Sequence, residues 1–339
     1  MAIAMAQQLK SRQPSIATLF AGTEEGLESR IVPSFGFKLE TINIGGLKKV
    51  GALQKLKTLF QLPLSFASSL RIVRRFSPQV VVGVGGYSSG PLVLAACLLR
   101  IPTLIIEPNV YPGFANRMLS RFATRAAVAF EETANWFGQK AKVTGVPVRS
   151  EFFEVPAKRS PRTPPTLLIY GGSRGSQPIN QLIVSALPFL SPEQVSIIHQ
   201  TGPPHYGTVS SGYQANDFPA EVLPYIDNMP EYFAKADMLL CRAGASTMAE
   251  ITAAGKPAIL IPFPHATDDH QRKNAEALSI RGAAVLVHQG STDGPQLATT
   301  IKELASESAR LTSMSVESRK LAKPRATETI VDLIEEIAK

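Results

Sequence analysis

Short apolar runs rich in β-branched residues alternate with helical patterns along the whole chain of 339 residues. The runs lie at 16–21, 79–84, 103–106 and 126–129 in the first half, and at 166–170, 195–200, 238–241, 258–261 and 284–287 in the second. Strands that alternate with helices build parallel sheets, because each parallel connection has to cross the sheet. The alternation therefore predicts an α/β fold.

A proline-rich, apolar-poor stretch at 156–165 separates the two halves and is typical of a linker. The length suits two domains that each bury a core, so we expect two doubly wound domains, 1–160 and 161–323. The remaining 324–339 form an amphipathic helical pattern, expected to pack back on the first domain. The chain opens on a helical pattern at Ala2–Lys10, so we expect the first strand and its turn to be missing.

Composition excludes several classes of protein. The hydrophobic fraction of 44% excludes disorder, and two cysteines, Cys97 and Cys241, are too few for a disulfide scaffold. Both cysteines lie in apolar runs, which predicts buried, reduced thiols in a cytosolic protein. The most apolar segment, Leu92–Ile106, contains Arg100 and Pro102 and is too short to cross a membrane.

The strongest motif is the glycine-rich turn Gly171–Gln177, which follows an apolar strand and opens a helical pattern. Amide groups at a helix start favour a phosphate, and the Ser173 hydroxyl offers one more donor. The alternative is a tight turn without a ligand. The spacing is not G-x-G-x-x-G, and the next strand ends in His199-Gln200-Thr201-Gly202 without a ribose-binding carboxylate, so NAD dependence is not expected.

Two further turns follow strands. The turn at 83–91 is glycine-rich, and it either cradles a second phosphate-bearing group or allows close helix–strand packing. In the segment 241–250, Thr247 and Glu250 match a capping box, so local helix capping is one interpretation. In the other, the amides of 245–247 accept a diphosphate and Glu250 accepts hydrogen bonds from a ribose diol.

A polar loop at 262–275 contains His265, Asp269 and His270. A metal site is not expected there, because the acidic residues are adjacent and no further ligand set is present. We expect His270 and Gln271 to read sugar hydroxyls instead.

In the first half, Asn109 follows a strand, and Arg149 follows a shorter one near the linker. An amide and a guanidinium at strand ends suit sugar or phosphate contacts, although each alone is often a solvated loop residue.

Charge is unevenly distributed. The net charge is +8, and the chain has no acidic residue between Glu40 and Glu107 but eight Lys or Arg there. With Leu53, Leu56 and Phe60 at helical spacing, the stretch suits an anionic membrane surface, at roughly 1 kcal/mol per basic residue. The alternative is an ordinary solvated helix face. Nucleic acid is not expected, because no aromatic platform accompanies the charge.

Together these motifs resemble the MurG family, glycosyltransferases that add N-acetylglucosamine to lipid I in peptidoglycan synthesis. The segments that carry the resemblance are GVGGYSSGP, EPN, TGVPVR, YGGSRGSQPIN, YIDNMPEYFAKADMLLCRAGASTMAEITAAGKPAILIPFP and DHQRKNA. The resemblance implies a GT-B fold of two Rossmann-like domains with the active site in the cleft between them. It also implies UDP-GlcNAc and lipid I as substrates, no metal or other cofactor, and a peripheral position at the cytoplasmic face of the inner membrane.

The resemblance also implies site residues. Ser173 is expected at the diphosphate, Ile226 at the uracil and Gln271 at the sugar hydroxyls. Asn109 and Arg149 are expected to approach the nucleotide sugar from the opposite domain. The diphosphate and ribose are expected at Ala245, Ser246, Thr247, Met248, Ala249 and Glu250, and the acceptor diphosphate at Gly85, Gly86 and Tyr87.

The family reaction is an inverting displacement, in which the 4-hydroxyl of the acceptor sugar attacks the anomeric carbon and UDP leaves. The family loop G-G-T-G-G-H, which carries a proposed catalytic histidine, has no counterpart here, and Ile106 replaces a frequent family histidine. The catalytic base therefore stays unassigned, and we expect an artificially short N-terminus. The alternatives are another GT-B enzyme (a lipid glycosyltransferase or a UDP-GlcNAc 2-epimerase) and a catalytically impaired UDP-sugar-binding protein.

Overall fold

The structure is a computed structural model that describes residues 1–24, 26, 28–42, 52–85, 89–156 and 163–338, with only the backbone of 52–62. The chain divides into two compact units. The first unit comprises Met1–Pro147 together with Arg325–Lys339, and the second comprises Val148–Pro324.

The first unit alternates helices and strands, as the sequence predicts. Its helices are α1 (Ala2–Arg12), α2 (Glu28–Ser34), α3 (Ala52–Phe76), α4 (Ser89–Leu98), α5 (Phe114–Leu119), α6 (Glu131–Ala134), the 3-10 turn η1 (Gly138–Lys140) and α14 (Ala326–Ile337). Its strands are β1 (Leu19–Gly22), β2 (Lys38–Thr41), β3 (Val81–Gly83), β4 (Thr103–Glu107), β5 (Arg125–Val128) and β6 (Ala141–Val143).

The described strands of the first unit form a parallel pair, β1-β2, and a parallel sheet of order β3-β4-β5-β6. Successive residues of β4 point to opposite faces of the sheet. Ile105 packs into the cluster formed with α4 and α5, whereas Leu104 and Ile106 pack into the cluster formed with α1 and α14. The sheet is therefore covered on both faces, which explains why β4 is buried along its whole length.

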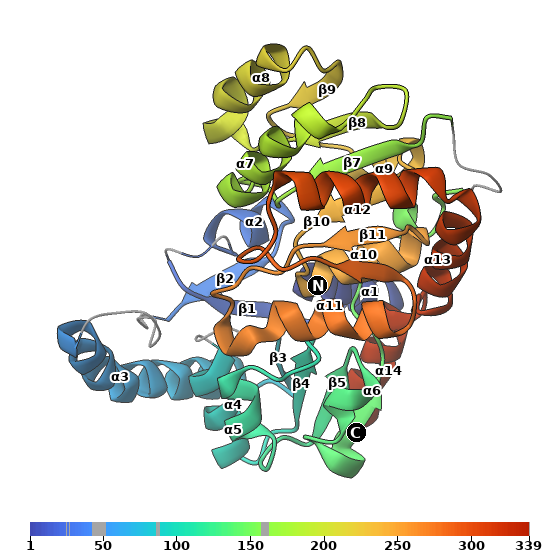
Figure 1. Ribbon diagram of the computed structural model, residues 1–339. Coiled ribbons are helices and arrows are strands. Elements are labelled where there is room, and N and C mark those ends of the chain that lie inside the picture. The colour runs from blue at the N-terminus through green and yellow to red at the C-terminus, as the bar shows by residue number, and fades with distance from the viewer. Residues whose placement is uncertain (25, 27, 43–51, 86–88, 157–162, 339) are drawn as a thin grey trace. The chain divides into compact units, whose positions relative to one another are not determined.

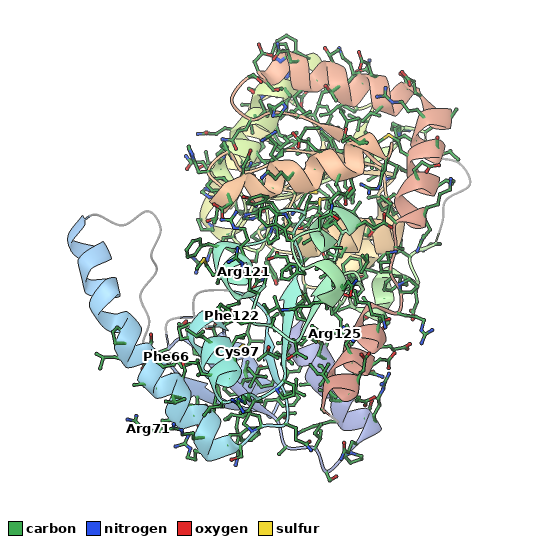
Figure 2. The ribbon with its side chains drawn as sticks, turned by 90° about the horizontal axis from the view of Figure 1, so that it is seen from below. Phe66, Arg71, Cys97, Arg121, Phe122 and Arg125 are labelled. Carbon is green, nitrogen blue, oxygen red and sulfur yellow. The ribbon has the colours of Figure 1, made fainter. Side chains whose placement is uncertain are left out.

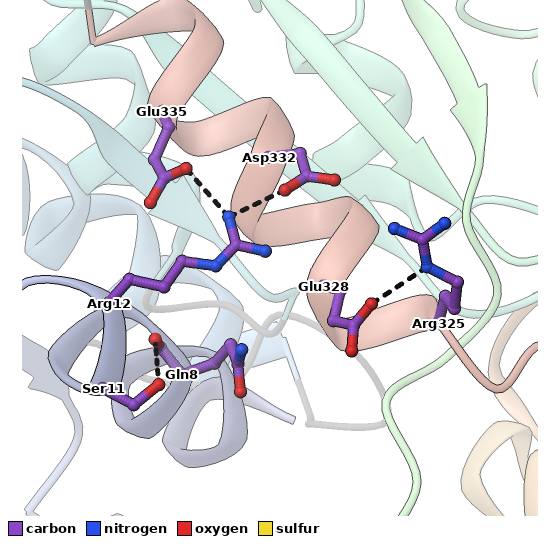
Figure 3. Close-up of polar contacts among 7 residues, drawn as sticks. All are labelled: Gln8, Ser11, Arg12, Arg325, Glu328, Asp332 and Glu335. Atoms are coloured by element: carbon purple, nitrogen blue, oxygen red, sulfur yellow. Dashed lines mark hydrogen bonds and ion pairs between the residues drawn. The ribbon is translucent and has the colours of Figure 1, made fainter.

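Helix α14 completes this second face. Ile330 and Val331 are fully buried in the cluster that also contains Met5 of α1. At the surface, Arg12 Nη1 donates to Asp332 Oδ1 at 2.7 Å and to Glu335 Oε2 at 2.8 Å, as Figure 3 shows. These ion pairs are solvent-exposed and contribute little by themselves, so the apolar face of α14 supplies most of the attachment.

The second unit is the larger α/β unit. Its strands are β7 (Thr166–Tyr170), β8 (Ser196–Gln200), β9 (Ala220–Leu223), β10 (Met238–Cys241), β11 (Ala258–Leu260) and β12 (Ala284–Leu286). Its α-helices are α7 (Gln177–Ala186), α8 (Tyr206–Ala215), α9 (Met229–Lys235), α10 (Ala245–Ala254), α11 (His270–Ile280), α12 (Gly294–Ser306) and α13 (Ser308–Lys320). Its 3-10 turns are η2 (Ser150–Phe152), η3 (Leu187–Phe189), η4 (Pro203–His205) and η5 (Thr267–Asp269).

The described strands of the second unit form one parallel sheet of six, in the order β12-β11-β10-β7-β8-β9. Figure 1 labels the strands from β11 to β9 in this order. From β7 the chain builds outward through β8 and β9, and then returns to the other side of β7 to add β10, β11 and β12. This is the strand order 3-2-1-4-5-6 of doubly wound nucleotide-binding sheets. The direction of winding reverses between β7 and β10, and a crevice for ligands opens at the carboxyl ends of strands at such a point.

The second unit begins at Val148, before the proline-rich stretch that marked the expected boundary near residue 160. Apolar anchors explain this position. Phe152 is fully buried and meets Phe233 of α9 edge-to-face, with ring centroids 5.0 Å apart, and Val155 is buried as well. The residues before the prolines therefore belong to the core of the second unit.

The sequence did not predict strands β2 and β9. Both are short and lie at sheet edges, and their residues are exposed or half-buried. A partly solvated edge strand needs no continuous apolar run, so it lacks the pattern that marks a central strand. The buried-thiol prediction is correct for Cys241 but wrong for Cys97, which is only half-buried.

Within the described part of the chain, no helix combines the length and the apolar character that crossing a bilayer requires.

Candidate functional site

The turn after β7 meets the turn after β8 backbone against backbone. A Cβ atom on Gly175 would lie 1.8 Å from the carbonyl oxygen of Thr201, and one on Gly202 would lie 2.2 Å from that of Arg174. Both glycines also have positive φ, 71° and 82°, which other residues adopt only with strain. Glycine at both positions therefore allows the ends of the two neighbouring strands to pack backbone against backbone. Ser173, in the same turn, is exposed.

Buried polar groups brace these two turns. Gln200 Nε2 donates to the carbonyl oxygen of Gly172 at 2.9 Å, and Asn180 Nδ2 donates to that of Thr201 at 2.9 Å. The ring of His199 lies 3.1 Å from Asn180 Oδ1 and 3.1 Å from the Tyr213 hydroxyl. Burial lowers the pKa of His199 to about 3, so this ring is neutral and serves the structure, not proton transfer.

The start of α10 lies at the carboxyl end of the adjacent strand β10. Its N-cap is Gly244, which has no side chain to cap the helix. The Met248 amide donates to the carbonyl oxygen of Gly244 at 2.9 Å. The three amides before it, at 245–247, precede the first intrahelical hydrogen bond and remain available as donors. The capping-box interpretation is therefore wrong, because Thr247 lies inside the helix and is not the N-cap.

Arg242 connects the two turns at the point where the winding reverses. Its Nη2 donates to Ser176 Oγ, the N-cap of α7, at 2.7 Å. Its Nη1 donates to the carbonyl oxygens of Ile261 and Pro262 after β11, at 3.0 and 3.1 Å. Burial lowers the pKa of Arg242 to about 10, which still leaves it charged at neutral pH. A cation thus lies among the ends of β7, β10 and β11.

Glu250 lies two residues after Met248 on α10 and is half-buried. Burial raises the pKa of its carboxyl group to about 7, although the nearby Arg149 guanidinium acts in the opposite direction. Arg149 itself is exposed and lies over the ring of Phe152, 5.1 Å from its centroid. The structure therefore brings Glu250 and Arg149 together within the second unit, whereas the sequence analysis assigned Arg149 to the first domain.

The loop after β11 is shaped by local hydrogen bonds. Asp268 and Asp269 both have positive φ, 54° and 56°, and α11 begins directly after them. Gln271 Oε1 accepts a hydrogen bond from the Phe263 amide at 3.0 Å, and His270 Nδ1 lies 2.6 Å from the carbonyl oxygen of Thr267. Gln271 therefore braces the loop through its oxygen. Among the described residues there is no cluster of three or more His, Cys, Asp or Glu that could hold a metal ion.

The remaining predicted residues of the second unit lie in the segment after β9 and in the first turns of α10. Ile226 is buried between β9 and α9, and Met248 is buried on α10. Ser246 is exposed, whereas Ala245, Thr247 and Ala249 are half-buried.

In the first unit, a buried carboxylate organises the segment after β4. Glu107 Oε1 accepts hydrogen bonds from the backbone amide of Asn109 at 3.0 Å and from its side chain at 3.1 Å. Glu107 Oε2 accepts from Asn116 Nδ2 at 2.8 Å and from the Gly113 amide at 2.9 Å. Of the predicted acceptor residues, Gly85 has a positive φ of 89°, and Gly86 and Tyr87 lie outside the described residues.

Sequence reasoning missed Arg242 as a site residue. The signal was available, because Arg242 is a cation directly after a fully apolar strand and directly before a helix-opening turn. Its partners, Ser176, Ile261 and Pro262, are distant in sequence, so only the folded chain identifies what it joins.

Comparisons with known proteins agree with this architecture. The model of the glycosyltransferase family 28 N-terminal domain matches residues 1–128, and that of the C-terminal domain matches residues 166–332. A protein of Myxococcus xanthus is 43% identical over 340 residues, covering 98% of this chain and 88% of its own. A protein of Solibacter usitatus is 41% identical over 341 residues, covering 100% and 92%. Both are named UDP-N-acetylglucosamine--N-acetylmuramyl-(pentapeptide) pyrophosphoryl-undecaprenol N-acetylglucosamine transferase.

Solved structures give the same result. The crystal structure of Acinetobacter baumannii MurG matches with a TM-score of 0.82 and 33% identity, over 99% of this chain and 95% of that one. A UDP-GlcNAc 2-epimerase from Neisseria meningitidis matches with a TM-score of 0.67 but only 16% identity, over 98% and 95%, so it shares the fold alone. The chain has the GT-B fold and belongs to glycosyltransferase family 28 and, within that family, to the MurG glycosyltransferases.

Proposed function

We propose that this chain transfers N-acetylglucosamine from UDP-GlcNAc to the 4-hydroxyl of the N-acetylmuramyl sugar of lipid I, forming lipid II. The observation that carries the proposal is the edge of the six-stranded sheet between β7 and β10. There, Arg242 precedes the open start of α10 by three residues, and its guanidinium donates to Ser176 at the end of the turn 171–176 and to the carbonyl oxygens of Ile261 and Pro262. The relatives are named as N-acetylglucosamine transferases for N-acetylmuramyl-(pentapeptide) pyrophosphoryl-undecaprenol, and one of them is 43% identical over nearly the whole chain.

The diphosphate of the donor fits this edge. The amides of Ala245, Ser246 and Thr247 have no acceptor within α10, and a phosphate oxygen supplies one. Ser173 adds a hydroxyl donor from the turn after β7. Arg242 supplies the positive charge that balances the developing negative charge as UDP leaves. Preorganised donors of this kind contribute about 3 kcal/mol each to transition-state stabilisation.

The nucleoside and the sugar fit the neighbouring residues. Glu250 in its ionised form accepts hydrogen bonds from the two ribose hydroxyls, and Ile226 offers an apolar contact to the uracil. Gln271 already uses its oxygen on the Phe263 amide, so its Nε2 group is the donor toward a sugar hydroxyl. We assign donor binding to the second unit, Val148–Pro324, which includes Arg149.

The acceptor is assigned to the first unit, Met1–Pro147 with Arg325–Lys339. Gly85, Gly86 and Tyr87 follow β3 in the sequence, and we assign the acceptor diphosphate to this glycine-rich stretch, because backbone amides suit a phosphate. Asn109, held by Glu107, is assigned to the nucleotide sugar. The reaction requires removal of a proton from the 4-hydroxyl, and we assign no residue to that role. Peripheral binding to the cytoplasmic face of the inner membrane completes the proposal.

The surface of α3, α4 and α5 supports the membrane assignment. Leu98 is 65% exposed, Met118 60% and Phe122 61%. Helix α4 contacts both α3 and α5, and Figure 2 shows Arg71 on α3 and Arg121 beside Phe122 just after α5. Exposed apolar and basic side chains together suit an interface with anionic lipid. The side chains of Lys55, Lys57 and the other residues of 52–62, on which the sequence interpretation rested, lie outside the described residues.

Vesicle sedimentation tests the membrane assignment. The double substitution Phe122→Ser and Arg121→Glu should reduce binding to phosphatidylglycerol vesicles severalfold, because it removes about 1 kcal/mol per basic residue together with an apolar contact. Arg281→Glu, in the second unit, is the control that should bind normally. Equal binding of all three proteins to anionic vesicles would refute this surface.

Radiolabelled transfer tests the reaction. The chain is incubated with UDP-[¹⁴C]GlcNAc and a lipid I analogue, and the lipid phase is analysed for a disaccharide product. Transfer to the lipid is the expected result. Release of UDP and free sugar without an acceptor would indicate an epimerase instead. Binding of UDP without any turnover would indicate a UDP-sugar-binding protein.

A further inference from the structure

Side chains of α13 bind the end of α10 opposite the proposed diphosphate site, and Arg319 contributes hydrogen bonds to the last two carbonyls of the helix. Arg319 Nη2 donates to the carbonyl oxygen of Ala254 at 3.1 Å, and Nη1 donates to that of Ala253. These carbonyl groups belong to the last turn of α10, so no backbone amide of the helix donates to them. A cation at this position also complements the negative end of the helix dipole.

The same guanidinium binds a second segment of the chain. Arg319 Nη2 donates to the carbonyl oxygen of Val155 at 2.9 Å, and Nη1 donates to that of Phe153 at 3.3 Å. Arg319 thus joins the end of α10 to residues 153–155, which lie more than 160 positions earlier in the sequence. Arg319 is half-buried, and this partial desolvation of the guanidinium lowers its pKa. Hydrogen bonds to a partly desolvated charge are strong.

Residues 149–155 run from this anchor toward Glu250. Val155 is buried beside Arg319, and Phe152 is buried against Phe233. The 3-10 turn η2, which contains Phe152, contacts α10, and Arg149 directly before it lies over the Phe152 ring, 5.1 Å from its centroid. The Arg149 guanidinium also acts electrostatically on Glu250 of the same helix. The segment is therefore fixed to α10 at the helix end through Arg319 and reaches the ribose side of the same helix through Arg149.

We propose that Arg319 is a positioning residue for nucleotide binding: by fixing residues 153–155 to the end of α10, it holds Arg149 beside Glu250. Arg319 itself touches no substrate. The inference rests on the proposed function, because it assumes that Glu250 and Arg149 lie at the nucleotide. It goes beyond that function by assigning a role to a residue on a helix that contributes no ligand contact.

A double-mutant cycle on UDP affinity tests the inference, with isothermal titration calorimetry as the measurement. Arg319→Gln should raise the dissociation constant for UDP by roughly 5- to 10-fold in the otherwise unchanged protein. In the Arg149→Ala background, the same substitution should change it by less than about twofold, because the residue through which it acts is already gone. Arg310→Gln, on the same helix but exposed and paired with Glu307 at the surface, is the matched control and should leave affinity unchanged.

The outcomes separate the possibilities. An equal loss in both backgrounds would mean that Arg319 stabilises the fold independently of Arg149 and would overturn the inference, as would an unchanged affinity. If Arg319→Gln gives little folded protein, Arg319→Lys carries the same cycle, because lysine keeps the charge but cannot bridge four carbonyl oxygens. If the unchanged protein does not bind UDP, the proposed function fails, whereas a failed cycle with normal UDP binding overturns the positioning role alone.

Discussion

The two ends of α10 differ in whether other groups of the second unit bind their free backbone groups. At the C-terminal end, Arg319 covers the carbonyls of Ala253 and Ala254, and Ser318 Oγ donates to that of Ile251 at 3.3 Å. At the N-terminal end, Gly244 provides no side-chain cap, and the first three amides have no acceptor within the helix. The fold thus satisfies the backbone groups at one end of the helix with its own side chains and leaves the amides at the other end open, where we propose that the diphosphate binds.

The largest effect on the open N-terminal end of α10 is expected from replacing Arg242, which binds the neighbouring segments at Ser176, Ile261 and Pro262. Arg242→Ala should weaken UDP binding by about 100-fold, because a partly buried cation in contact with a phosphate contributes on the order of 3 kcal/mol. Titration calorimetry measures the affinity, and the melting temperature reports any loss of folded protein. Arg272→Ala, whose side chain pairs with Asp269 and Glu276 at the surface, is the control. A normal UDP affinity in Arg242→Ala would contradict the assignment.

The open end itself can be tested without disturbing the helix. Ala245→Pro removes one amide donor at the first helical position, where proline is well tolerated, and the extended backbone of Gly244 (ψ 148°) suits a residue before proline. Loss of a hydrogen bond to a charged group should weaken UDP binding by roughly 10- to 30-fold, with little change in melting temperature. Ala245→Ser keeps the amide and should bind normally. Equal affinity of both variants would show that this amide does not contact UDP.

Glu250 lies between the two ends of α10, and its raised carboxyl pKa predicts that the stability of the protein depends on pH. Its carboxyl pKa is about 7 in the folded protein against 4.5 ordinarily, so the folded state binds more protons than the unfolded state between these values. The free energy of unfolding of the wild type therefore falls as pH rises from about 4.5 to 7, because Glu250 must ionise in a half-buried position. The melting temperature of Glu250→Gln should accordingly rise relative to that of the wild type over the same pH range.

The same substitution should act on binding in the opposite direction. Glu250→Gln should bind uridine about 10-fold more weakly than the wild type at pH 8, because an ionised acceptor is lost. The wild-type affinity for uridine should fall as pH drops below 7, and that of Glu250→Gln should stay flat. Uridine carries no titrating phosphate, so a pH dependence shared by both proteins would exclude Glu250 as its source.

The smallest effect is expected at Tyr170, next to Cys241 on the neighbouring strand. Its hydroxyl is buried beside the Cys241 thiol, which is at most a weak hydrogen-bond partner, and makes no hydrogen bond of normal geometry among the described residues. Tyr170→Phe should leave stability unchanged or raise it by up to about 1 kcal/mol, because a buried hydroxyl without a strong partner is removed. Urea unfolding measures this. A clear loss of stability would mean that the hydroxyl has a partner, and a loss of UDP affinity would mean that the partner is the nucleotide.

Much of the site could be predicted from the sequence because its chemistry is local. Gly171–Ser176 and Gly244–Thr247 each follow an apolar strand and open a helix, and consecutive residues carry that pattern. The glycines at 175 and 202 were visible as turn residues, but their mutual contact was not, since it depends on the pairing of β7 with β8. For the same reason, the sequence could not distinguish a capping box at Thr247 from a helix interior, because the N-cap is defined by where the backbone becomes helical.

The unit boundary shows the limit of composition as a guide. Prolines at 156–165 indicated a linker, whereas the second unit begins at Val148. What assigns residues 148–155 to it is the burial of Phe152 against Phe233, a contact between residues about eighty positions apart.

The sequence by itself determined the α/β class, the sites where strands turn into helices and the family to which the chain belongs. These properties follow from apolar periodicity and from glycines at fixed positions, which are encoded in neighbouring residues. Only the tertiary structure decided which strand ends lie side by side, that Arg242 joins three of them and that Arg319 closes one end of α10 while the other stays open. Such contacts join residues far apart in the chain, and they form only when burial of the apolar faces brings those residues together.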